Sequence, residues 1–113
     1  MTRPPEFRIL TNESGSRVEI AIFGELDLAT APQLTTEFER VGALDALELV
    51  VVDLRRLEFL DSSGLETILK LDASLRAKGV PLAIVRGPRA VERLFSVMQL
   101  DRRLRIVDDP AEV

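Results

Sequence analysis

The 113-residue chain contains no histidine, cysteine, tryptophan or tyrosine. These residue types supply most general bases near neutral pH, thiolate nucleophiles, soft metal ligands and aromatic stacking platforms. Their absence excludes Ser-His-Asp and Cys-His catalysis, thiolate or imidazole zinc sites, disulfide scaffolds and aromatic RNA-binding platforms. Carboxylate or lysine chemistry, phosphate binding and protein recognition remain open.

The chain also lacks a long apolar run and an excess of positive charge. No segment approaches about 18 uncharged apolar residues, and the opening MTRPPEF does not resemble a signal peptide, so we expect a cytoplasmic protein with no membrane partner. The formal net charge is −4, and its acidic excess lies in residues 1–56. This balance argues against direct nucleic-acid binding, which needs a basic surface.

The hydropathy pattern predicts one α/β domain, with a core over residues 7–107 and frayed ends at 1–6 and 108–113. We expect a hairpin of strands at 7–10 and 18–22, a helix from Thr30 with Pro32 in its first turn, a strand at 47–54, a turn at 55–60, a helix with its apolar spacing at 65–78, a strand at 80–85, a helix at 88–98 and a strand at 104–107. The order ββαβαβαβ predicts a mainly parallel mixed sheet with an antiparallel hairpin at its amino-terminal edge and helices packed on the sheet.

Two loops follow strands and precede helices, at residues 24–30 and 60–64. In a parallel sheet such loops lie at the carboxyl edge, where functional residues gather. If the preceding strands are neighbours, Asp27 and the acidic, hydroxyl-rich start of the second loop meet at one rim. A serine at a helix amino terminus is either a cap or a phosphorylation site, and the spacing alone favours a cap. Glu25 and Asp27 are more typical of exposed turn carboxylates than of an acid/base pair.

Three other side chains have local interpretations. Asp53 lies in an apolar strand segment, where a buried carboxylate needs Arg55 or a backbone amide as a partner unless the strand leaves the sheet at that point. Phe59 and Met98 fit the apolar core better than a ligand-stacking or exposed position.

Three motifs together resemble a known family. GELD stands at residues 24–27, VVDL at 51–54 and FLDSSGL at 59–65. This combination, with DSSGL between a buried strand and a helix, is similar to the STAS family and, within it, to the stand-alone anti-sigma factor antagonists of bacteria. The chain departs from the family at Leu60, where relatives often have methionine, and at Gln99, where they often have glycine.

The resemblance implies a phosphorylation switch in a protein that is not an enzyme. In this family an anti-sigma factor that is a GHKL-type serine kinase phosphorylates the first serine of the motif, here Ser62, with Ser63 as the second choice. The unphosphorylated antagonist binds the anti-sigma factor and releases the sigma factor, and a PP2C-type phosphatase resets the phosphorylated serine. No catalytic residue, metal site or cofactor is expected in the chain itself. The expected contact residues are Glu25, Asp27, Asp61, Ser62, Ser63 and Gly64.

Two other functions are compatible with the same fold. One is a nucleotide-binding STAS regulator, which a helix amino terminus at Ser62 would suit, although the sequence lacks a Gly-rich phosphate loop with its lysine and an aromatic base stacker at the motif. The other is a scaffold subunit of a stressosome or of a lipid-transport complex. By itself the chain is expected to be a monomer or a weak dimer.

Overall fold

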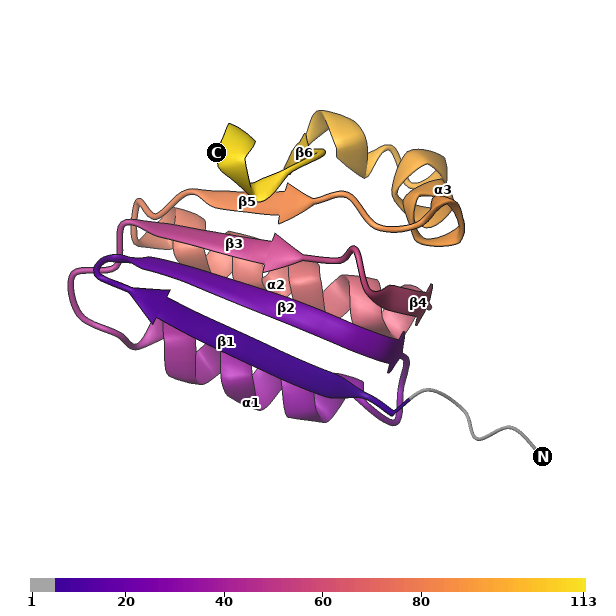
Figure 1. Cartoon of the computed structure of the whole chain (residues 1–113), viewed down its shortest axis with the longest axis horizontal. Coiled ribbons are helices and arrows are strands. Elements are labelled where there is room, and N and C mark those ends of the chain that lie inside the picture. Colours follow the sequence, from indigo (N-terminus) through magenta and orange to yellow (C-terminus); the bar gives the residue numbers. More distant parts are fainter. Residues whose placement is uncertain (1–5) are drawn as a thin grey trace.

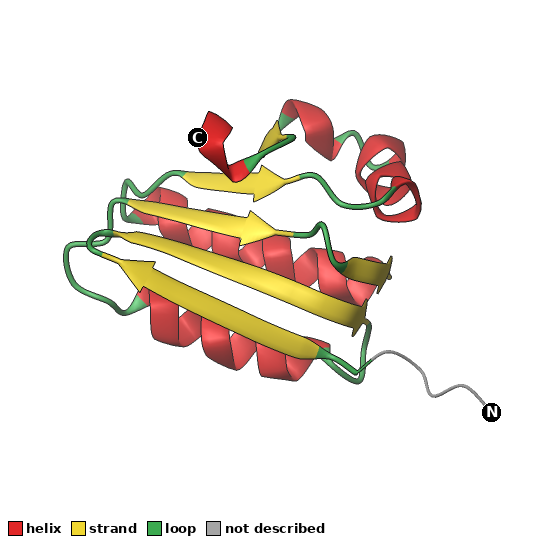
Figure 2. Ribbon diagram, viewed as in Figure 1, coloured by secondary structure: helices red, strands yellow, loops and turns green. Residues whose placement is uncertain are grey.

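The computed structural model describes residues 6–113 as a mixed sheet with two helices on one face and a third at one end (Figure 1, Figure 2). The strands and helices are β1 (Arg8–Ser14), β2 (Arg17–Leu26), α1 (Ala31–Gly42), β3 (Leu49–Asp53), β4 (Leu57–Leu60), α2 (Ser62–Ala77), β5 (Leu82–Val85), α3 (Arg89–Val97) and β6 (Arg105–Val107). Two short 3-10 turns, η1 (Leu100–Arg102) and η2 (Pro110–Glu112), flank β6.

The main sheet has the strand order β1-β2-β3-β5-β6. β1 pairs antiparallel with β2, whereas the β2–β3, β3–β5 and β5–β6 pairs are parallel. The central strands β3 and β5 are almost wholly apolar, as is usual for parallel strands covered on both sides. The predicted class, a mainly parallel mixed sheet with an antiparallel hairpin at one edge, is therefore confirmed.

Strand β4 is the element that the sequence pattern misses. The pattern predicts a turn at residues 55–60, but Leu57–Leu60 pairs in parallel with the end of β2. Leu57 and Leu60 are buried while the two residues between them are exposed, so neither alternation nor a continuous apolar run marks the strand. A register shift at Gly24 accompanies this second pairing of β2. Gly24 has φ +89, and a Cβ there would lie 2.7 Å from the Glu6 carbonyl oxygen.

The β1–β2 hairpin is tighter than predicted. β1 continues to Ser14, so that residues 12–14, expected in the loop, pair with β2. The turn consists of Gly15 and Ser16, and Gly15 has φ +62, a left-handed conformation of the kind that two-residue hairpin turns require.

The main core lies between the sheet and the two helices α1 and α2, which lie side by side behind it in Figure 1. Its fully buried side chains include Ile20, Ile22, Leu34, Val41, Val50, Val52, Ile68, Leu75 and Ile84. A smaller cluster of Val51, Val85 and Val107 belongs to the other face of the sheet. That face carries no helix, and it is covered in part by the carboxyl-terminal turn, whose Val113 packs against the small cluster.

Two side chains that were expected in the core, one phenylalanine and one methionine, lie at the surface. Phe59 is 47% exposed and Met98 is 55% exposed. Phe59 faces outward because the two leucines of β4 occupy the inward positions of that strand. Met98 is the C-cap residue that follows the last turn of α3.

The carboxyl-terminal tail, expected to fray from residue 108, forms the turn η2 instead. The Asp109 carboxylate accepts a hydrogen bond from the backbone N–H of Ala111 at 2.8 Å, and Arg17 donates to the Pro110 carbonyl oxygen at 3.1 Å. These contacts hold the tail against the sheet. The fraying expected at residues 1–6 falls almost wholly outside the described residues.

Candidate functional site

Two loops meet at the carboxyl ends of β2 and β4. In the parallel pairing of these strands Glu25 lies opposite Phe59 and Leu26 lies opposite Leu60, so both strands end at the same edge. The backbone N–H of Asp61 donates to the Leu26 carbonyl oxygen at 3.2 Å, which ties the two loops together. The shared rim predicted from the sequence therefore forms, and the unpredicted strand β4 is what joins its two halves.

We use the name rim for the surface formed by Glu25, Asp27, Asp61, Ser62 and Ser63. Its three carboxylates are partly exposed. In the part of the chain that the structure describes, no arginine or lysine forms an ion pair with any of them. The rim is therefore acidic at neutral pH, and a phosphate added to it would meet carboxylates rather than guanidinium groups.

Asp61 caps helix α2. Its Oδ1 accepts a hydrogen bond from the backbone N–H of Gly64 at 3.0 Å, and its backbone is extended, as an N-cap residue requires. Ser62 and Ser63 are the first two helical residues. The sequence pattern favoured a serine as a cap, but the carboxylate takes that place. Ser62 is exposed, and among residues 6–113 its hydroxyl makes no side-chain hydrogen bond.

Gly64 allows the first turn of α2 to touch the sheet. A Cβ at this position would lie 2.5 Å from Leu26 Cγ, 2.8 Å from Leu60 Cδ1 and 2.9 Å from the Leu26 carbonyl oxygen. Any side chain would push the helix start away from β2 and β4 and would shift Ser62 with it. Gly64, which the resemblance places among the partner contacts, is buried behind the exposed Ser62.

The Asp27 loop is held by its own side chains. Asp27 Oδ1 accepts from the backbone N–H groups of Ala29 at 2.9 Å and Thr30 at 3.1 Å. The Thr30 hydroxyl donates to the Glu25 carbonyl oxygen at 2.8 Å and accepts from the Asp27 N–H at 2.9 Å. Thr30 stands at the N-cap position of α1 but makes no side-chain cap, so the predicted capping role is wrong. The loop leaves Leu28 75% exposed.

A shallow cavity of about 520 Å³ opens beside the rim, between α1 and α2. Leu28, Pro32, Ser63, Glu66 and Lys70 are among its lining residues. The sequence pattern did not single out Leu28 or Lys70, because one exposed leucine in a loop and one lysine on a helix carry no signal of their own. Leu28 and Lys70 become relevant only because the fold places them in the same cavity as Ser63.

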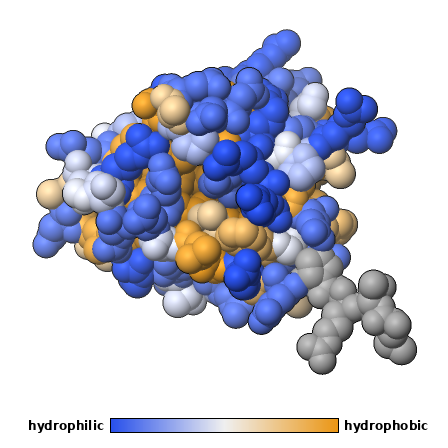
Figure 3. Space-filling view, in the orientation of Figure 1, coloured by the Kyte–Doolittle hydropathy of each residue, from blue (hydrophilic) through white to orange (hydrophobic). Residues whose placement is uncertain are grey.

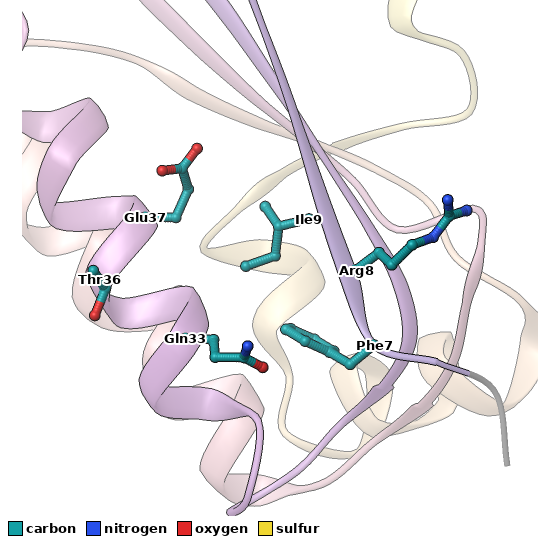
Figure 4. A pocket seen from close by; sticks show the side chains of 6 residues that line it. All are labelled: Phe7, Arg8, Ile9, Gln33, Thr36 and Glu37. Carbon is teal, nitrogen blue, oxygen red and sulfur yellow. The ribbon is translucent and has the colours of Figure 1, made fainter.

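Two further cavities are lined by none of the rim residues. One cavity of about 500 Å³ lies between β1 and α1 (Figure 4), and another of about 590 Å³ is lined by Arg8, Arg55 and Arg56. Within residues 6–113 no three His, Cys, Asp or Glu side chains are grouped so that they could hold a metal ion. No helix of that same part of the chain combines the length and the hydropathy needed to cross a bilayer.

Asp53 has a structural role at the end of β3. Its carboxylate accepts from the Arg55 guanidinium at 2.8 and 3.0 Å and from the Arg55 backbone N–H at 3.0 Å. Burial raises the pKa of Asp53, but the hydrogen bonds from Arg55 outweigh burial and hold the pKa below its ordinary value of 3.8. Both expected kinds of partner are present, and β3 ends at this residue.

Comparison with known proteins agrees with this geometry. The chain is 29% identical over 106 residues to the anti-sigma-F factor antagonist RsfB of Mycobacterium tuberculosis, covering 94% of this chain and 85% of that protein. The structure of an anti-sigma factor antagonist from Mycobacterium paratuberculosis superposes with a TM-score of 0.81 at 22% identity, covering 95% of this chain and 90% of that one. The Bacillus cell fate determinant SpoIIAA in its phosphorylated form gives a TM-score of 0.71 at 21% identity, covering 95% of both chains.

The family model for the STAS domain matches residues 8–113, which include both loops of the rim and every strand and helix. The solved structures show the same fold over nearly the whole chain. The chain belongs to the STAS domain family.

Proposed function

We propose that this chain is an anti-sigma factor antagonist and that phosphorylation of Ser62 switches its binding off. One observation carries the proposal: the Ser62 hydroxyl is exposed at the first position of α2, left free because Asp61 caps the helix. The relatives support it, since two of them are described as anti-sigma factor antagonists. A third relative of the same fold has been solved in a phosphorylated form.

The acidic rim suits a switch that works by repulsion. A phosphate adds about −1.5 to −2 charges at neutral pH. The added charge would stand next to Asp61 and beside the Asp27 loop, where no basic side chain of the described residues is ion-paired to the rim. The helix dipole of α2 offsets this repulsion by only about 0.3–1 kcal/mol. A partner surface that fits the neutral hydroxyl would therefore be repelled by the phosphorylated rim.

The chemistry of the switch belongs to the partners. The Ser62 hydroxyl oxygen attacks the γ-phosphorus of ATP held by a GHKL-type anti-sigma kinase, the new O–P bond replaces the bond to ADP, and the hydroxyl proton passes to a base of the kinase. This chain has no histidine, and within residues 6–113 no three carboxylates are grouped so that they could hold a metal ion, so in this proposal the base, ATP and magnesium come from the kinase. A PP2C-type phosphatase hydrolyses the phosphoserine, and the cycle operates in the cytoplasm, where sigma factors act.

Leu28 gives the unphosphorylated rim an apolar contact. It is 75% exposed and lines the cavity that Ser63 also lines. A large exposed apolar side chain beside the phosphorylation site is suited to bury itself in a partner, and such anchors carry most of the free energy of binding. We infer that the anti-sigma factor covers Leu28 and Ser62 together.

Phosphorylation and binding measured on matched variants test the proposal. We expect the anti-sigma kinase to transfer phosphate from ATP to the wild-type chain and to the Ser63→Ala variant but not to Ser62→Ala. Ser62→Ala should keep its binding to the kinase, whereas Ser62→Asp should lose at least about tenfold in affinity, which corresponds to 1.4 kcal/mol. Peptide mapping of the phosphorylated chain identifies the residue directly.

Phosphate found on Ser63 in this experiment would overturn the assignment to Ser62. Undiminished binding by the Ser62→Asp variant would overturn the repulsive switch, even if Ser62 proved to be the phosphorylated residue.

A further inference from the structure

Strand β4 contains one extra residue relative to its partner β2. Leu57 pairs with Gly24 and Phe59 pairs with Glu25, so Glu58, which lies between them, has no partner on β2. Successive strand residues point to opposite faces of a sheet, and an extra residue shifts that alternation and redirects a side chain. Phe59 therefore points to the same face of the sheet as Glu25.

This face is turned away from helix α2. Leu26 and Leu60 point toward the first turn of α2, because a Cβ on Gly64 would lie 2.5 Å from Leu26 Cγ and 2.8 Å from Leu60 Cδ1. Phe59 precedes Leu60 in the strand and so points the opposite way. It is 47% exposed, whereas each of the other four phenylalanines of the chain is partly or fully buried. The fold thus holds one aromatic side chain in water.

Negative charge borders Phe59 on the side of the rim. Glu25 lies opposite Phe59 on β2, and Asp61 follows two residues later in the chain. Within residues 6–113 neither carboxylate forms an ion pair. On the other side, Glu58 lines the cavity of about 590 Å³ that three arginines also line, so guanidinium groups offset its charge. Phe59 is therefore an apolar side chain whose acidic border faces Ser62.

Leu28 and Phe59 flank the edge at which Ser62 stands. Leu28 lines the cavity between α1 and α2, on the face of the sheet that carries these helices, whereas Phe59 points to the other face. Ser62 begins α2 at the edge where β2 and β4 end. Figure 3 looks onto the face without helices and shows apolar surface there, bordered by hydrophilic side chains. One edge of the molecule thus offers an exposed apolar side chain toward each face, with the serine at the same edge.

We propose that Phe59 is a second apolar anchor for the anti-sigma factor, which contacts the carboxyl edge of the sheet from Leu28 on one face to Phe59 on the other. This inference rests on the proposed function, because it places the same partner over Ser62. The partner surface that fits is an apolar socket for the Phe59 ring, with basic side chains along the border that faces Glu25 and Asp61. Aromatic side chains are enriched in the buried centres of protein interfaces.

Two anchors make binding sensitive to the charge at Ser62. A partner held at Leu28 alone can tilt away from a phosphate, whereas a partner held at Leu28 and Phe59 keeps its surface over the serine. The phosphate, with about −1.5 to −2 charges, then lies in a contact that excludes water, where repulsion is stronger than in bulk solvent. The loss of binding on phosphorylation therefore depends on both anchors.

Titration calorimetry of the full chain with the anti-sigma kinase tests the anchor. We expect Phe59→Ala to weaken binding at least about tenfold, as the loss of an anchor side chain does. Phe59→Gln, which is polar, should show a similar loss, whereas Phe59→Leu, which stays apolar, should bind nearly as the wild type does. Circular dichroism of each variant checks that the fold is kept.

Leu10→Ala is the matched control. Leu10 is 56% exposed on the same face as Phe59, but it pairs with Ala21, about 13 Å along β2 from Glu25. Its removal should leave binding unchanged. Folded Phe59→Ala and Phe59→Gln variants that bind like the wild type, or an equal loss in Leu10→Ala, overturn the inference.

The same titrations with Ser62→Asp separate the anchor from the proposed function. We expect this substitution to weaken binding by a smaller factor in the Phe59→Ala background than in the wild type, and equal factors would contradict the coupling of the two positions. If Ser62→Asp binds like the wild type while Phe59→Ala binds weakly, the anchor stands and the phosphorylation switch is refuted. If Ser62→Asp loses binding while Phe59→Ala does not, the switch stands and the anchor is refuted.

Discussion

At the scale of single residues, the position of the candidate site depends on a glycine that leaves no room for a side chain. Gly64 is the residue on which the first turn of α2 depends, because the space for a Cβ is already filled by the side chains and backbone of β2 and β4. Gln99 shows the opposite case. It is not a glycine, yet it keeps the left-handed conformation, with φ 55, at a cost of about 1–2 kcal/mol.

Gly64→Ala should destabilise the fold by about 1–3 kcal/mol, because the added methyl group overlaps Leu26 and the chain must shift to admit it. The free energy of unfolding in urea measures this loss. Gly42→Ala is the matched control: the nearest atom to its Cβ, Lys78 Nζ, is 3.9 Å away, and alanine favours a helix by up to about 1 kcal/mol over glycine. Equal effects of the two substitutions would contradict the close packing of α2 on the sheet.

At the scale of elements, the short strand β4 links the central sheet to the rim. The chain leaves β3 at Asp53, turns with the Leu57 N–H donating to the Leu54 carbonyl oxygen at 3.1 Å, and then pairs with β2. The Asp53 carboxylate holds the start of this turn through its hydrogen bonds to Arg55. Asp53 thus stabilises the start of the segment that leads through β4 to Ser62.

Asp53→Asn should lower the free energy of unfolding by about 1 kcal/mol at pH 7, since the charged hydrogen bonds to a partly exposed arginine are lost. The pKa of Asp53 is lower in the folded than in the unfolded chain, so its contribution is complete above the unfolded value, about pH 4, and is lost as the pH falls through the folded pKa. Urea unfolding of both proteins between about pH 7 and pH 3 measures the difference.

Asp45→Asn, an exposed carboxylate in the loop after α1, is the control and should show no such pH-dependent difference. A stability difference between the wild type and Asp53→Asn that grows toward low pH would contradict the assigned direction of the pKa.

At the scale of the whole molecule, the surface around Ser62 is separate from the hydrophobic core. The core is formed by the strands and by the inner faces of α1, α2 and α3, whereas Ser62 and Leu28 lie outside it. A change of charge at Ser62 should therefore alter recognition without altering the fold.

Ser62→Asp should change the free energy of unfolding by no more than about 0.5 kcal/mol, because the serine hydroxyl makes no hydrogen bond that the fold would lose. Ser62→Asn, which has nearly the same shape without the charge, serves as the reference, and thermal unfolding of both variants gives the comparison. A loss of several kcal/mol in the aspartate variant alone would show that the charge acts on the fold itself.

Much of the architecture is predictable from local pattern. The helices at Leu34 and Ile68 and the strands at Val50 and Ile84 are marked by apolar periodicity, and their alternation implies parallel βαβ units. Strand β4 is not marked, because its pattern of exposure depends on which strand it pairs with. Phe59 was misplaced for the same reason: the pattern shows an aromatic residue but not the direction in which its strand faces.

The sequence by itself determined the class of fold, the two acidic loops and the lack of histidine and cysteine, because periodicity and composition are local properties. Only the tertiary structure decided that Asp61 rather than a serine caps α2, that Gly64 is buried, and that Leu28 is exposed beside the serines. These facts depend on the pairing of β2 with β4, whose residues are more than 30 positions apart along the chain. Hydrogen bonding between such distant segments leaves no periodic mark in either of them.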